Sequence, residues 1–294
     1  MGRAIEIRRA DAMGMCFGVR DALQVIADVA RPRDVTIHGE LVHNGEVLRG
    51  LAARGFRQSD EARREVPATP AVLVTAHGVS ERERGRLLAA GKRLLDTTCP
   101  LVRRAHDAAQ ALAREGRRVI VLGRPGHVEV RGIVEDLEDP VVVHRVEDVR
   151  AWPQRRLGVV CQTTTSSDSV ARLTAEIRRR NPGADVRLVD TVCSPTKARG
   201  AALEALLPQV DALVVVGGRD SNNTRQLALR AERRGVSAVR VERADELDAA
   251  WLTGRRVIGL TAGTSTLPAT VDAVHERLLA MAAAAGSVTP RRPG

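Results

Sequence analysis

Two diverged copies of one motif decide the fold of this chain: Leu-Asp-Thr-Thr-Cys99-Pro and Val-Asp-Thr-Val-Cys193-Ser. Each copy is followed by an Ala-rich stretch whose apolar residues recur at helical spacing, and then by a short apolar strand that ends in Gly. The interval from Cys99 to Gly123 is 24 residues, and the interval from Cys193 to Gly217 is also 24 residues. Equal features at equal spacing indicate an internal repeat.

A fainter third copy opens the chain. Met-Cys16-Phe-Gly precedes a helical pattern and a strand that ends at Gly39, an interval of 23 residues from the cysteine. Each unit continues with a short helix, a second strand, an acidic helix start and a third strand. The acidic starts are Asp60-Glu61, Glu147-Asp148 and Asp245-Glu246.

Strands that alternate with helices indicate parallel βαβ units. We therefore expect an α/β fold of three similar lobes with parallel sheets, arranged about a pseudo-threefold axis. The expected division is 1–98 for the first lobe, 99–192 for the second, 193–286 for the third and 287–294 for a tail.

Polar side chains follow the predicted strands in every unit. In parallel sheets, ligands bind beyond the carboxyl ends of the strands. We therefore expect these residues to surround one site: His43, His77, His127, Glu129, Thr163, Ser221, Asn223 and Ser265. Packing about a threefold axis would also bring Cys16, Cys99 and Cys193 to one point. Cys161 lies inside an apolar strand and is interpreted as a core residue.

Three converging thiolates favour a metal centre with one open position. Zinc would accept three Cys with a His or a water molecule, and a four-iron cluster would leave one iron free for substrate. The residue types do not choose between the two metals. The histidines and the Ser and Asn side chains are donors suited to a diphosphate, and Glu129 is a natural proton carrier among them.

Composition excludes several classes of protein. No run of about 18 apolar residues exists, so we expect no membrane span. The N-terminus lacks the apolar core of a signal peptide, so we expect a cytoplasmic protein in which disulfides do not form. The net charge is +10, but the arginines are scattered and the chain has only two Phe and two Trp. Such a surface offers little for base stacking, and we expect no nucleic-acid partner.

The motifs around these residues resemble those of the 4-hydroxy-3-methylbut-2-enyl diphosphate reductases, in the family's order and spacing from about residue 10 to residue 282. The matching motifs are Gly14-Met-Cys16-Phe-Gly-Val, Leu41-Val-His43-Asn44, Ala76-His77-Gly78-Val-Ser80, Asp96-Thr-Thr-Cys99-Pro-Leu-Val, Gly126-His127-Val-Glu129-Val, Gln162-Thr163-Thr164, Cys193, Ser221-Asn222-Asn223 and Thr261-Ala-Gly-Thr-Ser265. The family usually has Pro between the His and the Glu of the fifth motif, where this chain has Val128.

The resemblance implies a central 4Fe–4S cluster held by Cys16, Cys99 and Cys193. It implies reductive dehydration of (E)-4-hydroxy-3-methylbut-2-enyl diphosphate to isopentenyl and dimethylallyl diphosphate. Glu129 and Thr163 would be the catalytic pair that delivers protons, and a reduced ferredoxin or flavodoxin would supply electrons. The substrate-binding set implied is His43, His77, His127, Thr163, Ser221, Asn222, Asn223 and Ser265.

Three alternatives stay open at this point. One is a diverged paralogue that reduces a related allylic diphosphate, because several departures from the family pattern fall in the third repeat. Another is a zinc-dependent phosphate-ester hydrolase that uses the same Cys and His residues. The third is a non-catalytic basic protein that binds nucleic acid.

Overall fold

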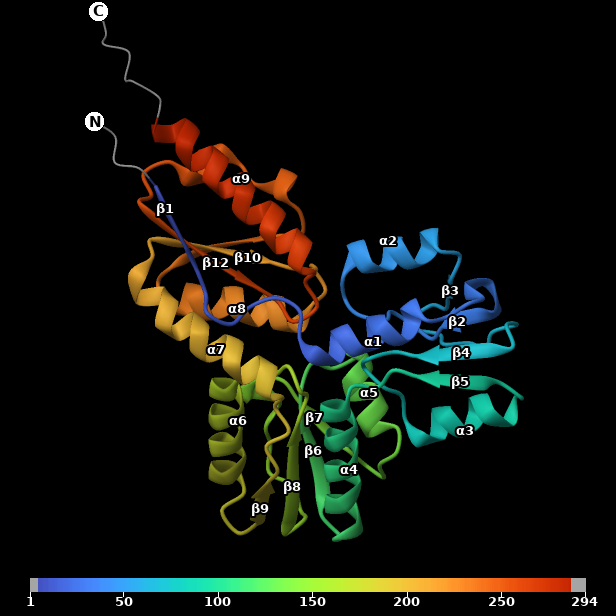
Figure 1. Ribbon diagram of the computed structural model, residues 1–294. Helices are drawn as coiled ribbons and strands as arrows, with labels where there is room; N and C mark the ends of the chain where they lie inside the picture. The colour runs from blue at the N-terminus through green and yellow to red at the C-terminus, as the bar shows by residue number, and fades with distance from the viewer. Residues whose placement is uncertain (1–4, 287–294) are drawn as a thin grey trace, which may run out of the picture. The chain divides into compact units, whose positions relative to one another are not determined.

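The computed structural model describes residues 5–286, and within them it contains three four-stranded sheets whose strand pairs are all parallel (Figure 1). The prediction of an α/β fold with three parallel-sheet lobes is confirmed. The predicted threefold axis stays a prediction, and the predicted tail at 287–294 lies outside the described residues.

Sheet B belongs to the first lobe and has the strand order β3-β2-β4-β5. Its strands are β2 (Val35–Ile37), β3 (Arg57–Gln58), β4 (Ala71–Val74) and β5 (Arg93–Asp96). The helices of this part of the chain are α1 (Phe17–Ala27), the 3-10 helix η1 (Pro32–Asp34), α2 (Gly45–Ala53) and α3 (Glu81–Ala89). Every residue of β4 is buried, as expected for a central strand covered on both faces.

Sheet C belongs to the second lobe and has the order β7-β6-β8-β9. Its strands are β6 (Arg118–Leu122), β7 (Val141–Val143), β8 (Arg156–Cys161) and β9 (Asp185–Leu188). Its helices are α4 (Pro100–Arg114), α5 (Val128–Val134), the 3-10 helix η2 (Val146–Asp148) and α6 (Ser167–Arg180). Residues of β6 alternate between two apolar clusters, one containing side chains of α4 and the other side chains of α6, so these two helices cover opposite faces of the sheet.

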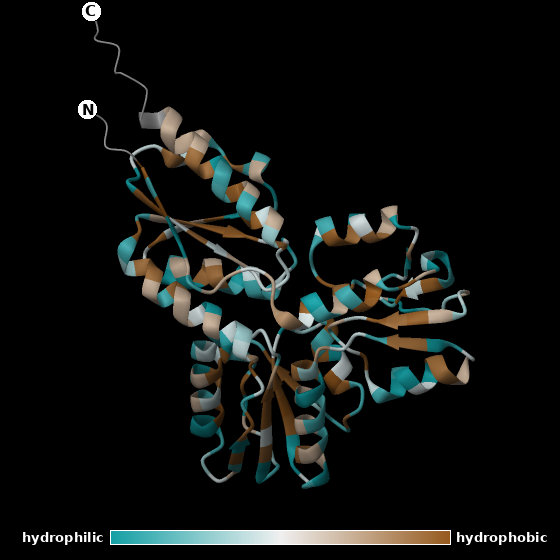
Figure 2. Ribbon diagram, in the orientation of Figure 1, coloured by the Kyte–Doolittle hydropathy of each residue, from teal (hydrophilic) through white to brown (hydrophobic). Residues whose placement is uncertain are grey.

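Sheet A has the order β1-β12-β10-β11. Its strands are β1 (Glu6–Arg9), β10 (Ala212–Val216), β11 (Ser237–Val241) and β12 (Val257–Ala262). Its helices are α7 (Ser194–Leu206), α8 (Asn222–Arg233) and α9 (Pro268–Gly286), with 3-10 helices η3 (Leu207–Gln209), η4 (Ala244–Glu246) and η5 (Ala249–Leu252). In Figure 2 the central strands of the three sheets carry mostly hydrophobic residues, whereas much of the helix surface is hydrophilic.

The three sheets share one topology, with the second, first, third and fourth strands of each lobe in that spatial order. In sheet A the fourth position is taken by β1 from the start of the chain, which pairs with β12 in register from Glu6 with Val257 to Arg9 with Leu260. The expected first lobe, 1–98, included these residues; the pairing places them in the sheet of the third lobe instead. Consistent with this exchange, one compact unit joins the described residues up to Cys16 with those from Pro195 onward, and Phe17–Ser194 form the other.

The acidic helix starts have different outcomes. Glu147-Asp148 lies within η2 and Asp245-Glu246 lies within η4, both short 3-10 helices. Asp60-Glu61 begins a hydrogen-bonded turn instead, because the Asp60 carboxylate accepts the N–H groups of Ala62 and Arg63 and the chain reaches a left-handed residue at Arg64, φ +44°. No helix of the described residues is long and apolar enough to cross a membrane.

Candidate active site

Three histidines from two lobes form a cluster. His43 stacks on His77 with ring centroids 4.4 Å apart, and His127 meets them edge-on at 5.1 Å and 5.7 Å. His43 follows β2 and precedes the N-cap of α2, His77 follows β4, and His127 is itself the N-cap of α5. All three therefore lie just beyond the carboxyl ends of parallel strands.

Burial keeps His77 and His127 neutral near pH 7. Burial, with a smaller effect from the neighbouring His43 and Arg124, lowers the pKa of His127 to about 3. Burial also puts the pKa of His77 well below its ordinary value of 6.5, with His43 and His127 adding to the effect. His127 Nδ1 accepts the Glu129 N–H, so its hydrogen is on Nε2. The buried Nδ1 of His77 has no hydrogen-bond partner, which leaves it for a polar ligand.

Glu129 lies in the first turn of α5, two residues after His127, and is 1% exposed. Its Oε1 accepts the Thr163 N–H at 2.6 Å, and its Oε2 accepts the Thr163 hydroxyl at 3.0 Å. Burial raises the pKa of Glu129 to about 7 against these two hydrogen bonds, which lower it. A carboxyl group with this pKa can both hold and release a proton near neutral pH.

Val128 occupies the first residue of α5 and is buried. This is the helix position where proline is favoured for its fixed φ, and in this chain Val128 stands there. Glu129 therefore stands on a helix and is held at both carboxylate oxygens.

Thr163 connects Glu129 to one of the predicted cysteine ligands. Its carbonyl accepts the N–H of Cys193 at 3.0 Å, while its own N–H and hydroxyl bind Glu129. On the first lobe, the N–H of Cys99 is bound by the carbonyl of Ala76, the residue before His77. Cys99 and Cys193 are thus each tied through the backbone to one of the polar strand ends.

Each of the three predicted ligands stands at the start of a helix. Cys99 is the N-cap of α4, and Cys16 and Cys193 directly precede α1 and α7. All three are partly exposed, whereas Cys161 is fully buried in the core of sheet C, as predicted. Cysteine side chains are the usual ligands of iron–sulfur clusters.

The chain leaves room at one of these thiols. A Cβ atom on Gly18 would lie 2.5 Å from the sulfur of Cys99, so only glycine fits beside it. Between residues 5 and 286, no three His, Cys, Asp or Glu side chains already surround a point in a way that would hold a metal ion. Cys16 belongs to one compact unit and Cys99 and Cys193 to the other, so a cluster shared by all three stays a prediction.

The remaining predicted residues belong to the unit that contains sheet A. Ser221 is the N-cap of α8, with its hydroxyl accepting the Thr224 N–H at 3.3 Å. Asn223 Oδ1 accepts the N–H of Thr264 at 3.1 Å, which joins the loop after β10 to the loop after β12. Ser221, Asn222, Asn223 and Ser265 are all at least nine-tenths buried. Their expected binding of a diphosphate stays a prediction.

Two residues of the site region were missed by the sequence-based prediction. Glu40 Oε2 lies 2.8 Å from His43 Nδ1, a contact that the three-residue spacing of an acid and a histidine could have suggested. Arg199 is buried on α7 and donates from its guanidinium to the carbonyls of Gly14 and Pro195. It thereby holds the backbone two residues before Cys16, and no local sequence pattern predicts that contact.

Comparison with known proteins finds close agreement over most of the chain. The family model described as LytB protein matches residues 7–279. A protein of Aromatoleum aromaticum named 4-hydroxy-3-methylbut-2-enyl diphosphate reductase is 36% identical over 93% of this chain and 89% of its own length. A protein of Methylibium petroleiphilum with the same name is also 36% identical, over 95% of this chain and 86% of its own length.

Solved structures agree as well. The E-1-hydroxy-2-methyl-but-2-enyl-4-diphosphate reductase of Plasmodium falciparum superposes with a TM-score of 0.85 at 27% identity, covering 92% of this chain and 86% of that one. A structure of (E)-4-hydroxy-3-methyl-but-2-enyl diphosphate reductase, described as the terminal enzyme of the non-mevalonate pathway, gives a TM-score of 0.63 at 27% identity, covering 93% and 99%.

Proposed function

The chain belongs to the LytB protein family and is an oxidoreductase of isoprenoid biosynthesis, and we propose that it reduces (E)-4-hydroxy-3-methylbut-2-enyl diphosphate to isopentenyl and dimethylallyl diphosphate. The reaction consumes two electrons and two protons. The allylic C–O bond breaks, one proton leaves with the hydroxyl as water, and the other joins the carbon skeleton.

The observation that carries this proposal is the buried carboxyl group of Glu129, which accepts two hydrogen bonds from Thr163 and has a pKa raised to about 7. Glu129 lies in the first turn of α5, directly beside the N-cap residue His127 and Val128. A leaving hydroxyl needs a proton, and a buried carboxyl group is protonated only when its pKa is raised. Glu129 would donate that proton, and the hydroxyl of Thr163 would pass or orient it. His43, His77 and His127 would bind the diphosphate, together with Ser221, Asn222, Asn223 and Ser265.

The cofactor that we propose is a 4Fe–4S cluster, which would supply the electrons and an open iron site for the substrate. Cys16, Cys99 and Cys193 suit it, because each is a partly exposed thiol at a helix start, and the space beside Cys99 is kept by Gly18. A reduced ferredoxin or flavodoxin is the proposed electron donor. Residues of this chain then bind the substrate, exclude water and deliver protons.

Metal analysis of protein purified without oxygen tests the proposal against the zinc hydrolase. We expect a brown protein that contains iron and sulfide and turns over the substrate with a chemical reductant. Cys99→Ser should lose most of the iron, whereas Cys161→Ser, matched in chemistry but buried in the core, should keep it. A colourless protein that binds zinc, or full iron in Cys99→Ser, would contradict the cluster.

The paralogue alternative is tested with the same preparation. The relative turnover of the proposed substrate and of related allylic diphosphates distinguishes the two. We expect the highest kcat/KM for (E)-4-hydroxy-3-methylbut-2-enyl diphosphate.

A further inference from the structure

Glu40 contacts the histidine cluster directly at one of its members. Its carboxylate accepts from His43 Nδ1 at 2.8 Å. A carboxylate can only accept, so it fixes the hydrogen of His43 on Nδ1 and sets the plane of the ring. Glu40 therefore orients His43 directly, and it orients His77 through the stacking of the two rings, whose centroids are 4.4 Å apart.

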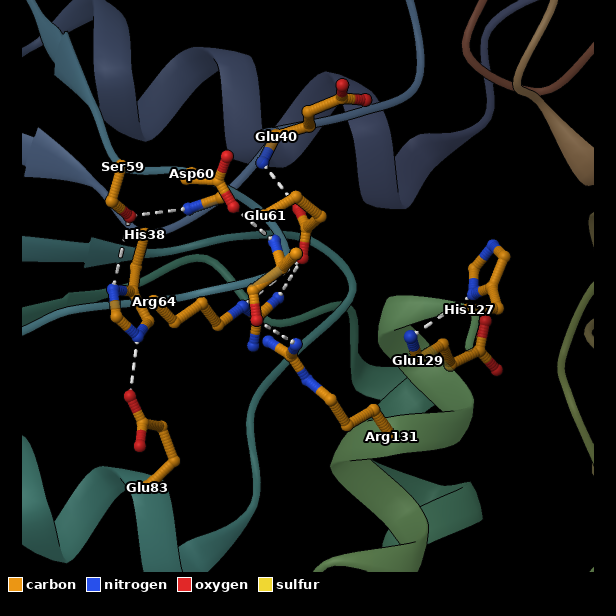
Figure 3. A network of polar contacts seen from close by, with 12 residues as sticks. His38, Glu40, Ser59, Asp60, Glu61, Arg64, Glu83, His127, Glu129 and Arg131 are labelled. Atoms are coloured by element: carbon orange, nitrogen blue, oxygen red, sulfur yellow. Dashed lines mark hydrogen bonds and ion pairs between the residues drawn. The ribbon is translucent and has the colours of Figure 1, made fainter. Parts of the chain in front are cut away.

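The position of Glu40 is itself fixed by Glu61. Oε2 of Glu61 accepts the Glu40 N–H at 2.7 Å, and Oε1 accepts from the guanidinium of Arg64 at 2.7 Å. Gly39, at φ +92°, packs so closely on this carboxylate that any side chain there would overlap it. Figure 3 shows Glu61 between the Glu40 backbone and Arg64.

The contacts continue past Arg64 and return to the same turn. Arg86 donates to the Arg64 carbonyl and pairs with Glu83 at 2.7 Å. Glu83 accepts from His38 Nε2 at 2.6 Å, and His38, which is fully buried, lies 3.4 Å by its Nδ1 from the Ser59 hydroxyl. That hydroxyl accepts the N–H of Gly39 at 3.1 Å.

These contacts form a closed ring that begins and ends at the Gly39-Glu40 turn, and we call it the Glu40 ring. Its side chains are Glu61, Arg64, Arg86, Glu83, His38 and Ser59. The same segment reaches the helix of the proton carrier, because Arg131 of α5 donates to the carbonyl of Ala62 at 3.1 Å (Figure 3). Closed hydrogen-bond networks hold their members in one geometry, and two members of this ring, Arg64 and His38, are buried.

We propose that Glu40 is a positioning residue that orients His43 and His77 toward a diphosphate, and that the Glu40 ring holds it in place. The proposal rests on the proposed function in one respect, that these histidines bind the diphosphate. Glu40 touches no reacting atom. It acts through the two histidines, and Glu61 acts through Glu40.

The test measures binding of inorganic diphosphate by calorimetry to the iron-loaded full chain, together with steady-state kinetics. In Glu61→Ala we expect the Kd for diphosphate and the KM to rise about tenfold, as for loss of outer-shell support to a binding group. The kcat should change little, because the lost interaction serves substrate and transition state alike. Iron content should equal that of the wild type.

Two further variants separate positioning from general damage. Glu65→Ala removes the same charge from an exposed position of the same segment and should leave Kd and KM unchanged. Glu61→Gln keeps an oxygen that can accept the Glu40 N–H and should restore part of the affinity. If Glu61→Ala does not fold, the comparison of Glu61→Gln with Glu65→Ala replaces it. We then expect a modest loss of diphosphate affinity in Glu61→Gln and no loss in Glu65→Ala.

A double-mutant cycle between Glu40→Ala and Glu61→Ala shows whether Glu61 works through Glu40. We expect the double variant to bind diphosphate no more weakly than Glu40→Ala alone, which is a non-additive result. Additive losses, an unchanged Kd in Glu61→Ala, or an equal loss in Glu65→Ala would overturn the proposal. Diphosphate binding is measured without turnover. The proposal for the Glu40 ring can therefore be refuted while the proposed reductase activity is confirmed, and the reductase activity can be refuted while the ring proposal is confirmed.

Discussion

Glu129→Gln is the most informative single change, because it removes one ionisable group and keeps the size of the side chain. In the folded protein, burial raises the pKa of Glu129 from its ordinary 4.5 to about 7. Gln cannot donate the proton that the leaving hydroxyl needs. We expect turnover to fall at least about a hundredfold, the lower range for a positioned general acid. The iron content should stay at the level of the wild type.

The same pKa predicts a stability difference with a definite sign. Below pH 4.5 both the folded and the unfolded wild-type chain hold the proton on this carboxyl, so its ionisation costs nothing. Between pH 4.5 and about 7 only the unfolded chain loses the proton, so the free energy of unfolding falls as pH rises. Above about pH 7 the full cost is present, on the order of 3 kcal/mol from the difference between the two pKa values.

Glu129→Gln escapes this cost, so relative to the wild type it should gain stability as pH rises from 5 to 8. Comparing the urea unfolding of the two proteins at each pH isolates the effect, because the other titrating groups cancel. Infrared difference spectra between them should show the carboxylic acid band of Glu129 vanishing as pH passes about 7. Turnover close to that of the wild type, or parallel stability curves for the two proteins, would refute the assignment.

Two further predictions follow from contacts in the same unit. Gly18→Ala should lower the iron content, because its Cβ would lie 2.5 Å from the sulfur of Cys99. The control Gly50→Ala, in open space on α2, should keep the iron and raise the free energy of unfolding by about 0.5 to 1 kcal/mol. Thr163→Val removes the hydroxyl that lowers the pKa of Glu129, so the infrared band should persist to higher pH than in the wild type, and an unshifted or downward-shifted titration would contradict this contact.

The sequence by itself determined the three-lobed α/β fold. Each Cys-to-Gly interval of the repeats contains a helical pattern followed by a strand, and hydrophobic periodicity and turn residues are both local properties of the chain. For the same reason the strand-end histidines could be listed in advance: His43 and His77 follow β2 and β4, which pair in parallel in sheet B, and His127 follows β6 of sheet C. Cys161 could likewise be assigned to the core, because it lies inside an apolar strand.

Only the tertiary structure decided which strand completes each sheet. β1 pairs with β12, more than 240 residues along the chain, and a strand's own residues do not record which edge it joins. The Glu40 ring was equally invisible, because nothing in the sequence around Asp60-Glu61 records that the Glu61 carboxylate lies against Gly39 and Glu40. The pKa of Glu129 is decided in the same way, since burial and the Thr163 contacts depend on what the rest of the chain packs around the carboxyl group.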